Sequence, residues 1–218
     1  NCGGTTNITY FAGGVAGYVA NQAATNLTNE TTGVINFTAT AVQNHNVGGV
    51  IGCVSSADVT TLTNKAALTY SGHTSTGNKV DGDNNTICVG GVVGAMFGAE
   101  SALKTAKDLT NSGVVTLSNF KRGGELKTAY SNFGGVIGYV TFCNLDNCDN
   151  TATKFTQASS ATITKLEAGN NLHQIRLGGV VGYAPDMGNI TNCDNSAELD
   201  LNAPNAIHHR VGGLFGSA

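Results

Sequence analysis

The sequence predicts an all-β protein: a right-handed parallel β-solenoid of about five coils of 34–44 residues with loop insertions. Two observations support this prediction. A glycine-rich cassette recurs along the whole chain, and 30 Gly with abundant Asn and Thr disfavour helices while favouring strands and tight turns. Cassettes begin near residues 12, 47, 89, 133, 177 and 211, so residues 1–218 are expected to form a single repeat domain.

Each cassette reads Gly-Gly-apolar-apolar-Gly and is preceded by an apolar residue. The first glycines are separated by 35, 42, 44, 44 and 34 residues. The glycine pairs, which would stack as a strip, are Gly13 and Gly14, Gly48 and Gly49, Gly90 and Gly91, Gly134 and Gly135, Gly178 and Gly179, and Gly212 and Gly213.

A second element follows the first five cassettes: a small or apolar residue, two spacers, Leu or Cys, one spacer and Asn. A third, apolar element comes next, so we expect three strands per coil. Stacking at about 4.8 Å would place equivalent residues above one another. The second element therefore predicts a structural asparagine ladder of Asn29, Asn64, Asn111, Asn150 and Asn195.

The glycine cassette also carries a prediction about packing. If it is one regular strand with period-two alternation, both of its faces are apolar. We therefore expect this face of the solenoid to be covered outside as well as inside, and the glycines to admit a close neighbouring layer. The cover would be an inserted loop or another molecule.

The cassettes resemble the GLUG motif, which occurs in tandem in large surface and secreted proteins. Gly213-Leu214-Phe215-Gly216 matches the motif literally, whereas the other five cassettes carry Val where the motif has Leu. The aromatic residue that often follows is Tyr18, Tyr139 or Tyr183 in three cassettes and is replaced by Cys53, Ala95 and Ser217 in the others. The resemblance implies a role in adhesins, stalks or surface fibres and transfers no catalytic residue.

Composition narrows the classes of function. Charged residues make up 11% of the chain, against roughly 25% in typical soluble domains. The net charge of −3 argues against a nucleic-acid partner, and glycines interrupt every apolar run, so no membrane-spanning helix is expected. No cofactor or metal site is predicted.

Cysteines and glycosylation sequons favour an extracellular or cell-surface location. Cys148 and Cys193 occupy the same repeat position, where stacking would permit a disulfide. Alternatively, Cys143 could form a disulfide with Cys148, or the cysteines could be free thiols that fill the core. Candidate N-glycosylation sites are Asn7, Asn26, Asn36, Asn84 and Asn189.

Three hypotheses for function remain open from the sequence. The first is a non-catalytic subunit of an extracellular fibre or surface layer that assembles head-to-tail through open solenoid ends, at Asn1 and Cys2 on one side and Leu214 and Phe215 on the other. The second is an adhesin or glycan-binding module whose partners are other surface proteins or glycans. The third is a polysaccharide-acting enzyme, for which Asp149 and Asp194 would be the stacked carboxylate pair.

Overall fold

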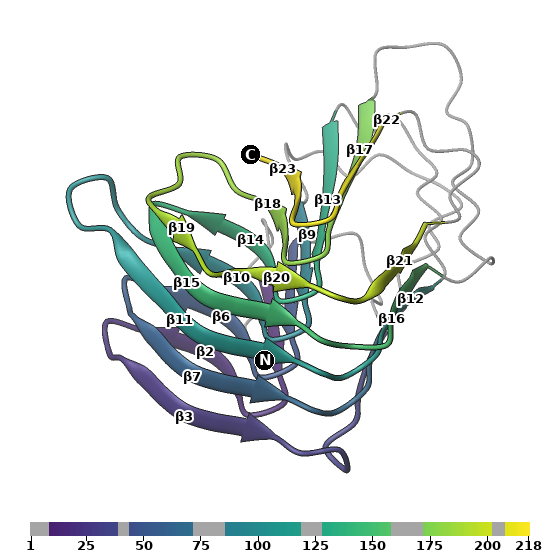
Figure 1. Cartoon of the computed structure of the whole chain (residues 1–218), viewed down its shortest axis with the longest axis horizontal. Helices are drawn as coiled ribbons and strands as arrows, with labels where there is room; N and C mark the ends of the chain where they lie inside the picture. Colours follow the sequence, from purple (N-terminus) through teal and green to yellow (C-terminus); the bar gives the residue numbers. More distant parts are fainter. Residues whose placement is uncertain (1–8, 39–43, 72–85, 119–127, 158–171, 202–207) are drawn as a thin grey trace.

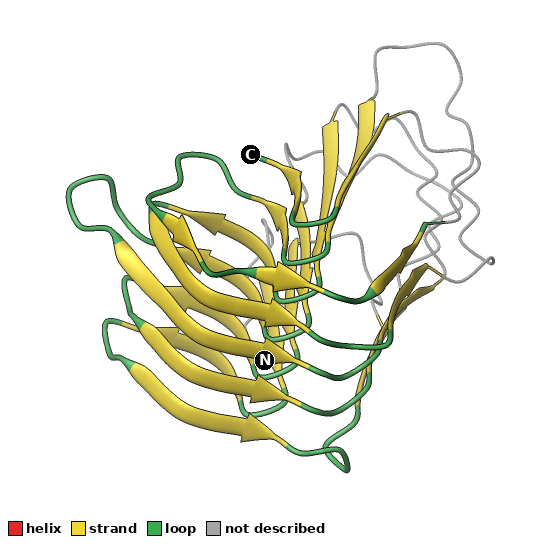
Figure 2. Ribbon diagram, in the orientation of Figure 1, coloured by secondary structure: helices red, strands yellow, loops and turns green. Residues whose placement is uncertain are grey.

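The computed structural model of the chain is built from β-strands arranged in four stacked sheets (Figures 1 and 2). It describes residues 9–38, 44–71, 86–118, 128–157, 172–201 and 208–218. No helix occurs among these residues, and the strand pairs within the sheets are parallel. The all-β class and the parallel stacking of a solenoid are therefore confirmed.

Each cassette contributes one strand to each of two neighbouring sheets, which we call sheets A and B. Sheet A contains β1 (Thr9–Gly13), β5 (Asn44–Gly48), β9 (Thr86–Gly90), β13 (Thr128–Gly134), β17 (Leu172–Gly178) and β22 (His208–Gly212). Sheet B contains β2 (Ala16–Ala20), β6 (Ile51–Ser55), β10 (Val93–Phe97), β14 (Ile137–Thr141), β18 (Val181–Tyr183) and β23 (Phe215–Ser217).

The segments between cassettes form sheets C and D. Sheet C contains β3 (Ala24–Asn29), β7 (Val59–Asn64), β11 (Lys104–Asn111), β15 (Cys143–Asn150) and the short β19 (Ile190–Thr191) and β20 (Asp194–Asn195). Sheet D contains β4 (Ile35–Thr38), β8 (Leu68–Ser71), β12 (Val115–Ser118), β16 (Lys154–Gln157) and β21 (Glu198–Asp200). We call one cassette, with its strands in sheets A and B, together with the strands of sheets C and D that follow it, a rung.

The cassettes lie side by side in register. The first glycines of the six cassettes are consecutive strand partners, from Gly13 opposite Gly48 through to Gly178 opposite Gly212. Equivalent positions of the second element are also paired, as in Leu62 opposite Leu109. The prediction that the cassettes stack as equivalent rungs is therefore confirmed.

The expectation of three strands per rung is wrong, because the glycine cassette is not one strand. The chain leaves sheet A at the first glycine and enters sheet B three residues later, so a complete rung has strands in four sheets. The backbone turns at the second glycine, so the side chains after the turn do not continue the in-and-out alternation of the sheet A strand. As a result Val50 and Ile51, adjacent in sequence, both lie in the same apolar core.

Two separate apolar cores fill the space between the sheets. One lies between sheets B and C and contains residues such as Ile51, Val54 and Leu62. The other lies between sheets A and D and contains residues such as Val89, Val115 and Phe133. Sheets A and B face each other outside both cores, so the expected cover of the cassette is the chain's own neighbouring strand rather than a loop or another molecule.

Backbone contact between sheets A and B explains the glycines. A Cβ built on Gly94, the last glycine of its cassette, would lie 2.5 Å from the Val47 nitrogen in sheet A of the preceding rung. A Cβ on Gly91, the second glycine, would lie 2.0 Å from the carbonyl oxygen of Gly135 in the next rung. Neither partner is a flexible side chain, so only glycine fits at these positions.

A left-handed residue accounts for the spacing of the second element. In each rung the second spacer in sheet C has a positive φ, as in Thr61 (55°) and Asp108 (53°). This residue acts as a bulge that interrupts the alternation of side chains. Residues three apart in sequence, such as Val59 and Leu62, therefore both point into the core, and Asn64 follows at the normal spacing of two.

Replacement of Gly91 by alanine is expected to destabilise the fold by about 3 kcal/mol, because its Cβ would collide with backbone that cannot move alone. Gly213 is the matched control, since it holds the same cassette position in the last described rung and a Cβ there meets nothing within 4 Å. Urea unfolding followed by circular dichroism should show Gly213→Ala within about 0.5 kcal/mol of the parent chain. Equal effects of the two substitutions would contradict the packing account.

Candidate functional site

The five asparagines at the end of sheet C form a continuous hydrogen-bonded column. The Nδ2 of each donates to the Oδ1 of the asparagine in the next rung, at distances from 2.9 to 3.1 Å. Asn64 and Asn111 are fully buried, whereas Asn195 at the end of the column is partly exposed. The structure thus brings together all five residues of the predicted ladder.

Two of the interior asparagines, Asn64 and Asn111, also close the corner between sheets C and D. The Nδ2 of Asn111 donates to the Gly113 carbonyl oxygen at 3.0 Å, and the Gly113 N–H donates to Asn111 Oδ1 at 3.2 Å. Asn64 makes the same pair of contacts with Ala66. One amide side chain therefore satisfies two backbone groups of the turn as well as its neighbours in the column.

The asparagine column lies directly against the glycine corner, where it separates the two apolar cores. Asn29 Nδ2 donates to the Gly49 carbonyl oxygen at 2.9 Å. A Cβ on Gly49 would lie 2.4 Å from Asn64 Cγ, and one on Gly91 would lie 2.4 Å from Asn111 Cγ. The glycine and asparagine elements recur together because each fills the space that the other leaves.

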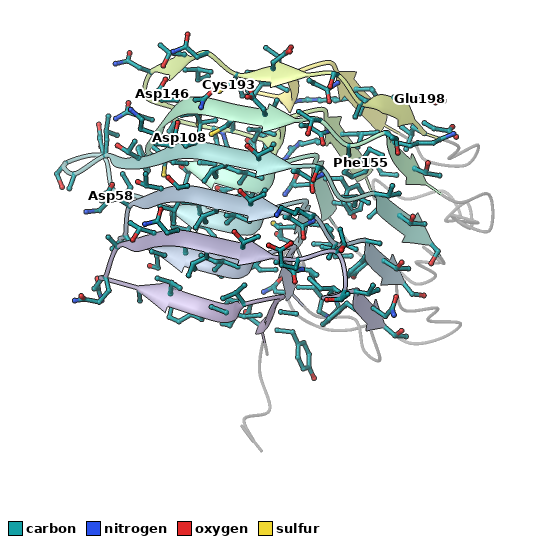
Figure 3. The ribbon with its side chains drawn as sticks, turned by 60° about the horizontal axis from the view of Figure 1, so that its bottom comes forward. Asp58, Asp108, Asp146, Phe155, Cys193 and Glu198 are labelled. Carbon is teal, nitrogen blue, oxygen red and sulfur yellow. The ribbon has the colours of Figure 1, made fainter. Side chains whose placement is uncertain are left out.

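The cysteine pair predicted from the repeat is brought together as thiols. Cys148 lies in β15 and Cys193 lies between β19 and β20, each immediately before one of the paired residues Asp149 and Asp194, and both are free thiols in the structure. Cys148 is buried in the core, while Cys193 is partly exposed on the last complete rung (Figure 3). Cys143 lies in the same core, and its Sγ is 3.2 Å from the Thr141 carbonyl oxygen. Cys2 lies outside the described residues.

The two thiols of this pair differ in acidity. A hydrogen bond from the Cys148 thiol lowers the pKa of Cys193 to about 7, against the opposing effect of its partial burial. The same contact, together with burial, raises the pKa of Cys148. Cys193 is therefore the described cysteine with the greatest thiolate character near neutral pH.

The predicted glycosylation sites divide into two groups. Asn26, Asn36 and Asn189 are exposed, in β3, in β4 and immediately before β19 respectively. Asn7 and Asn84, like the end residue Asn1, lie outside the described residues. Asn29 also begins a sequon, but it is buried in the column and its amide is fully engaged.

Asp149 and Asp194, the carboxylate pair of the enzyme hypothesis, are both engaged with backbone. Asp149 Oδ1 accepts the Asp194 N–H at 3.0 Å, and Asp194 Oδ1 accepts the Asn195 N–H at 2.9 Å. Asp58 and Asn144 use their side-chain oxygens in the same way, each accepting an N–H of the next rung at 2.7–2.8 Å. These polar side chains at the surface therefore join rung to rung.

Ion pairs also connect neighbouring rungs on the outer face of sheets C and D. Lys107 Nζ lies 3.3 Å from Asp146 Oδ2. The other carboxylate oxygen, Asp146 Oδ1, accepts hydrogen bonds from Thr191 and Asn192. These hydrogen bonds lower the pKa of the Asp146 carboxyl group, and the Lys107 ammonium adds to the effect. Figure 3 shows Asp108 and Asp146 on neighbouring strands of sheet C. Because these charges are exposed to solvent, each pair adds little stability.

Within the described ranges, no group of three or more His, Cys, Asp or Glu side chains is placed to hold a metal ion. The same part of the chain contains no helix that is both long and apolar enough to cross a membrane. Among the described residues, a groove lies between sheets A and B and is lined by residues that include Cys53 and Tyr139. The sequence analysis does not predict this groove. The feature of the sequence that indicates it is the replacement, by Cys53 and Ala95, of the aromatic residue that follows the cassette in other rungs.

Comparison of the chain with protein-family models, with curated proteins and with solved structures gives no match. The GLUG resemblance therefore stays a prediction, and function has to be argued from the residues of this chain.

Replacement of Asn111 by alanine should lower the free energy of unfolding by about 3 kcal/mol, since the buried groups of Asn64, Gly113 and Asn150 would lose their partner. Asn195→Ala is the control, because that amide is half-buried and has an asparagine neighbour on one side only; we expect a loss of about 1 kcal/mol. Denaturant midpoints of the two variants provide the comparison, and equal losses would contradict a cooperative column.

Cys193 should react with iodoacetamide in the folded protein, at a rate that rises through pH 7 as its thiolate forms. Cys88 should stay unlabelled until the chain is unfolded, because burial raises its pKa to about 12. Cys148→Ala removes the donor, so the midpoint for Cys193 should rise toward the usual thiol value of about 8.5. Peptide mass spectrometry after timed labelling measures each rate, and an unchanged midpoint in Cys148→Ala would contradict this account.

Proposed function

We propose that the chain is a non-catalytic structural subunit of an extracellular fibre or cell-surface layer and that copies assemble head-to-tail through the two end rungs. The proposal includes the right-handed winding and the roughly five coils of 34–44 residues expected from the repeat intervals. The observation that carries it is the placement of exposed apolar side chains, which gather on the first and last described rungs.

Interior rungs bury the apolar residues of the cassette, whereas the end rungs expose them. Val50, Val92, Val136 and Val180 are fully buried, but their register equivalents Val15 and Leu214 are 47% and 37% exposed. Other exposed large apolar side chains of the two end rungs are Tyr10, Phe11, Tyr18, Val34, Ile190 and Val211. Phe215 is partly buried against the core between sheets B and C.

The strand edges of these rungs favour a partner of the same kind. In the interior, Val50 N–H donates to the Val92 carbonyl oxygen at 2.9 Å, and every neighbouring pair of cassettes repeats this bond. A further rung stacked on β22 and β23 would continue the same ladder and cover Leu214. The first rung of a second copy presents the matching apolar side chains, and such a heterologous contact produces an open filament.

The surface location rests on composition and on the placement of the sequons. Charged residues are few, and the described sequons at Asn26, Asn36 and Asn189 are exposed. Asn26 and Asn36 lie in the strands of sheets C and D that belong to the first described rung, so glycans there would project from the faces of these sheets. The rigid asparagine column and the four ladders along the axis suit a mechanical role.

Lysine at either end rung should block assembly, because a buried unpaired charge is costly where two apolar rungs meet. We expect Val15→Lys to remain monomeric at concentrations at which the parent chain forms polymers, as measured by sedimentation velocity and negative-stain electron microscopy. Val114→Lys is the control, since Val114 is 36% exposed in an interior rung and should leave assembly unchanged.

Mixing two end variants tests the head-to-tail geometry itself. Val15→Lys chains and Leu214→Lys chains should each be monomeric alone but form dimers together, because the unaltered Leu214 rung of one chain then meets the unaltered Val15 rung of the other. Longer species should not form, since both remaining ends of such a dimer carry lysine. A parent chain that stays monomeric at every concentration, or a mixture that does not dimerise, would overturn the proposal.

A further inference from the structure

The groove between sheets A and B is a concave feature of the described residues, and most of its lining lies outside the end rungs that the proposed assembly uses. Its volume is about 440 Å³, within the range of small-ligand pockets. The two sheets touch through backbone at the glycine corner, where Gly52 approaches Ala12 and Gly94 approaches Val47. They diverge beyond this corner, so the groove opens away from both apolar cores (Figure 1).

The groove lies where two consecutive rungs carry small side chains at a position that is tyrosine in three other rungs. Tyr18, Cys53, Ala95, Tyr139 and Tyr183 occupy this register position along sheet B. Tyr139 and Tyr183 show that the fold accepts tyrosine on adjacent rungs, with ring centroids 5.7 Å apart. Between Tyr18 and Tyr139, Cys53 lines the open space, and the fully buried Ala95 adds no ring to fill it.

A pair of aromatic rings closes each end of this space. Phe11 and Tyr18 from the first rung have centroids 5.0 Å apart, and Phe97 and Tyr139 have centroids 5.4 Å apart. All four rings line the groove. The site is therefore a short compartment between two aromatic pairs rather than a trough along the whole axis.

Hydroxyl and amide groups line the two side walls. Sheet A contributes Thr9, Asn44 and Thr86, which are consecutive partners in register, and sheet B contributes Ser55. Asn44 Oδ1 accepts the Thr86 N–H at 2.7 Å, which holds this amide in place. These groups can both donate and accept hydrogen bonds.

The floor carries no charge. It is formed by Asn46, Cys53 and Cys88, and burial raises the pKa of each thiol to about 12. Among the described residues that line the groove, none is an Asp, Glu, Lys, Arg or His. A charged ligand would lose its hydration here without gaining a counter-ion from these residues, so the site favours a neutral one.

We propose that this groove binds a short neutral saccharide, or the terminal sugars of a longer neutral glycan, with the aromatic pairs against the C–H faces of the sugar rings and the wall groups hydrogen-bonded to sugar hydroxyls. A neutral ligand with apolar faces and many hydroxyl groups matches aromatic ends, polar walls and an uncharged floor together. This binding function is distinct from assembly, because most of the compartment lies on interior rungs and only Thr9, Phe11 and Tyr18 belong to the first described rung, which assembly would also cover.

The full chain can be titrated with neutral tetrasaccharides of glucose, mannose and xylose by calorimetry and by saturation-transfer NMR. We expect saturable binding of at least one, and no binding of tetragalacturonate, which carries carboxylates. Cys53→Tyr extends the row of tyrosines into the compartment and should weaken binding at least about tenfold. Ser217→Tyr places the same ring at the same register position on the last rung, outside the groove, and should leave binding unchanged.

Tyr18→Ala and Tyr139→Ala should each weaken binding without changing the circular dichroism spectrum, because one stacking ring is lost at each end of the compartment. The proposal is overturned if no neutral probe binds at about 10 mM, a concentration that detects even millimolar affinity. It is equally overturned if the charged probe binds as well as the neutral ones, or if Cys53→Tyr binds like the parent chain. A Cys53→Tyr variant that loses assembly but not saccharide binding would show that the groove takes a segment of a second copy instead.

Discussion

The contact between the glycine corner and the asparagine column determines the rest of the structure. At this point four sheets and two apolar cores meet, and there is room for one amide side chain but not for a Cβ on the facing glycine. The amide satisfies the buried turn and passes a hydrogen bond to the next rung. Every rung must therefore present the same two elements, because a substitution in either would also disturb the rung above or below.

The sequence predicts well whatever repeats at a fixed place in every rung. Six cassettes and five Asn residues indicated stacking in register, and the structure places Asn64 beside Asn111 as expected. Sequence reasoning failed where two backbone conformations share one residue pattern. Period-two alternation was applied across Gly49, although the chain turns a corner there, so Val50 and Ile51 were assigned to opposite faces instead of one core.

The left-handed residue of sheet C is a second feature that the sequence analysis does not predict, although the spacing of the repeat indicates it. The spacing of three between Ala106 and Leu109 is incompatible with one face of a regular strand unless a bulge lies between them. Asp108 supplies that bulge, and its equivalents are Asn26, Thr61, Asn147 and Asn192. Asn and Asp tolerate positive φ better than most residues, so four of these five identities fit the backbone, while Thr61 is held there by its neighbours on both sides.

Residues that break the repeat pattern indicate local sites that the repeated residues cannot indicate. A stacking pattern constrains every inward position, so a residue that differs between rungs marks a place where packing does not decide its identity. Cys53 and Ala95 are such departures, and they remove two rings from a row in which tyrosine is otherwise accommodated on neighbouring rungs. The resulting compartment costs the fold little, because the close contacts of Gly52 and Gly94 beneath it already hold sheets A and B together. A repetitive scaffold can thus acquire a single local site by small side chains alone, without an inserted loop or a change in the path of the chain.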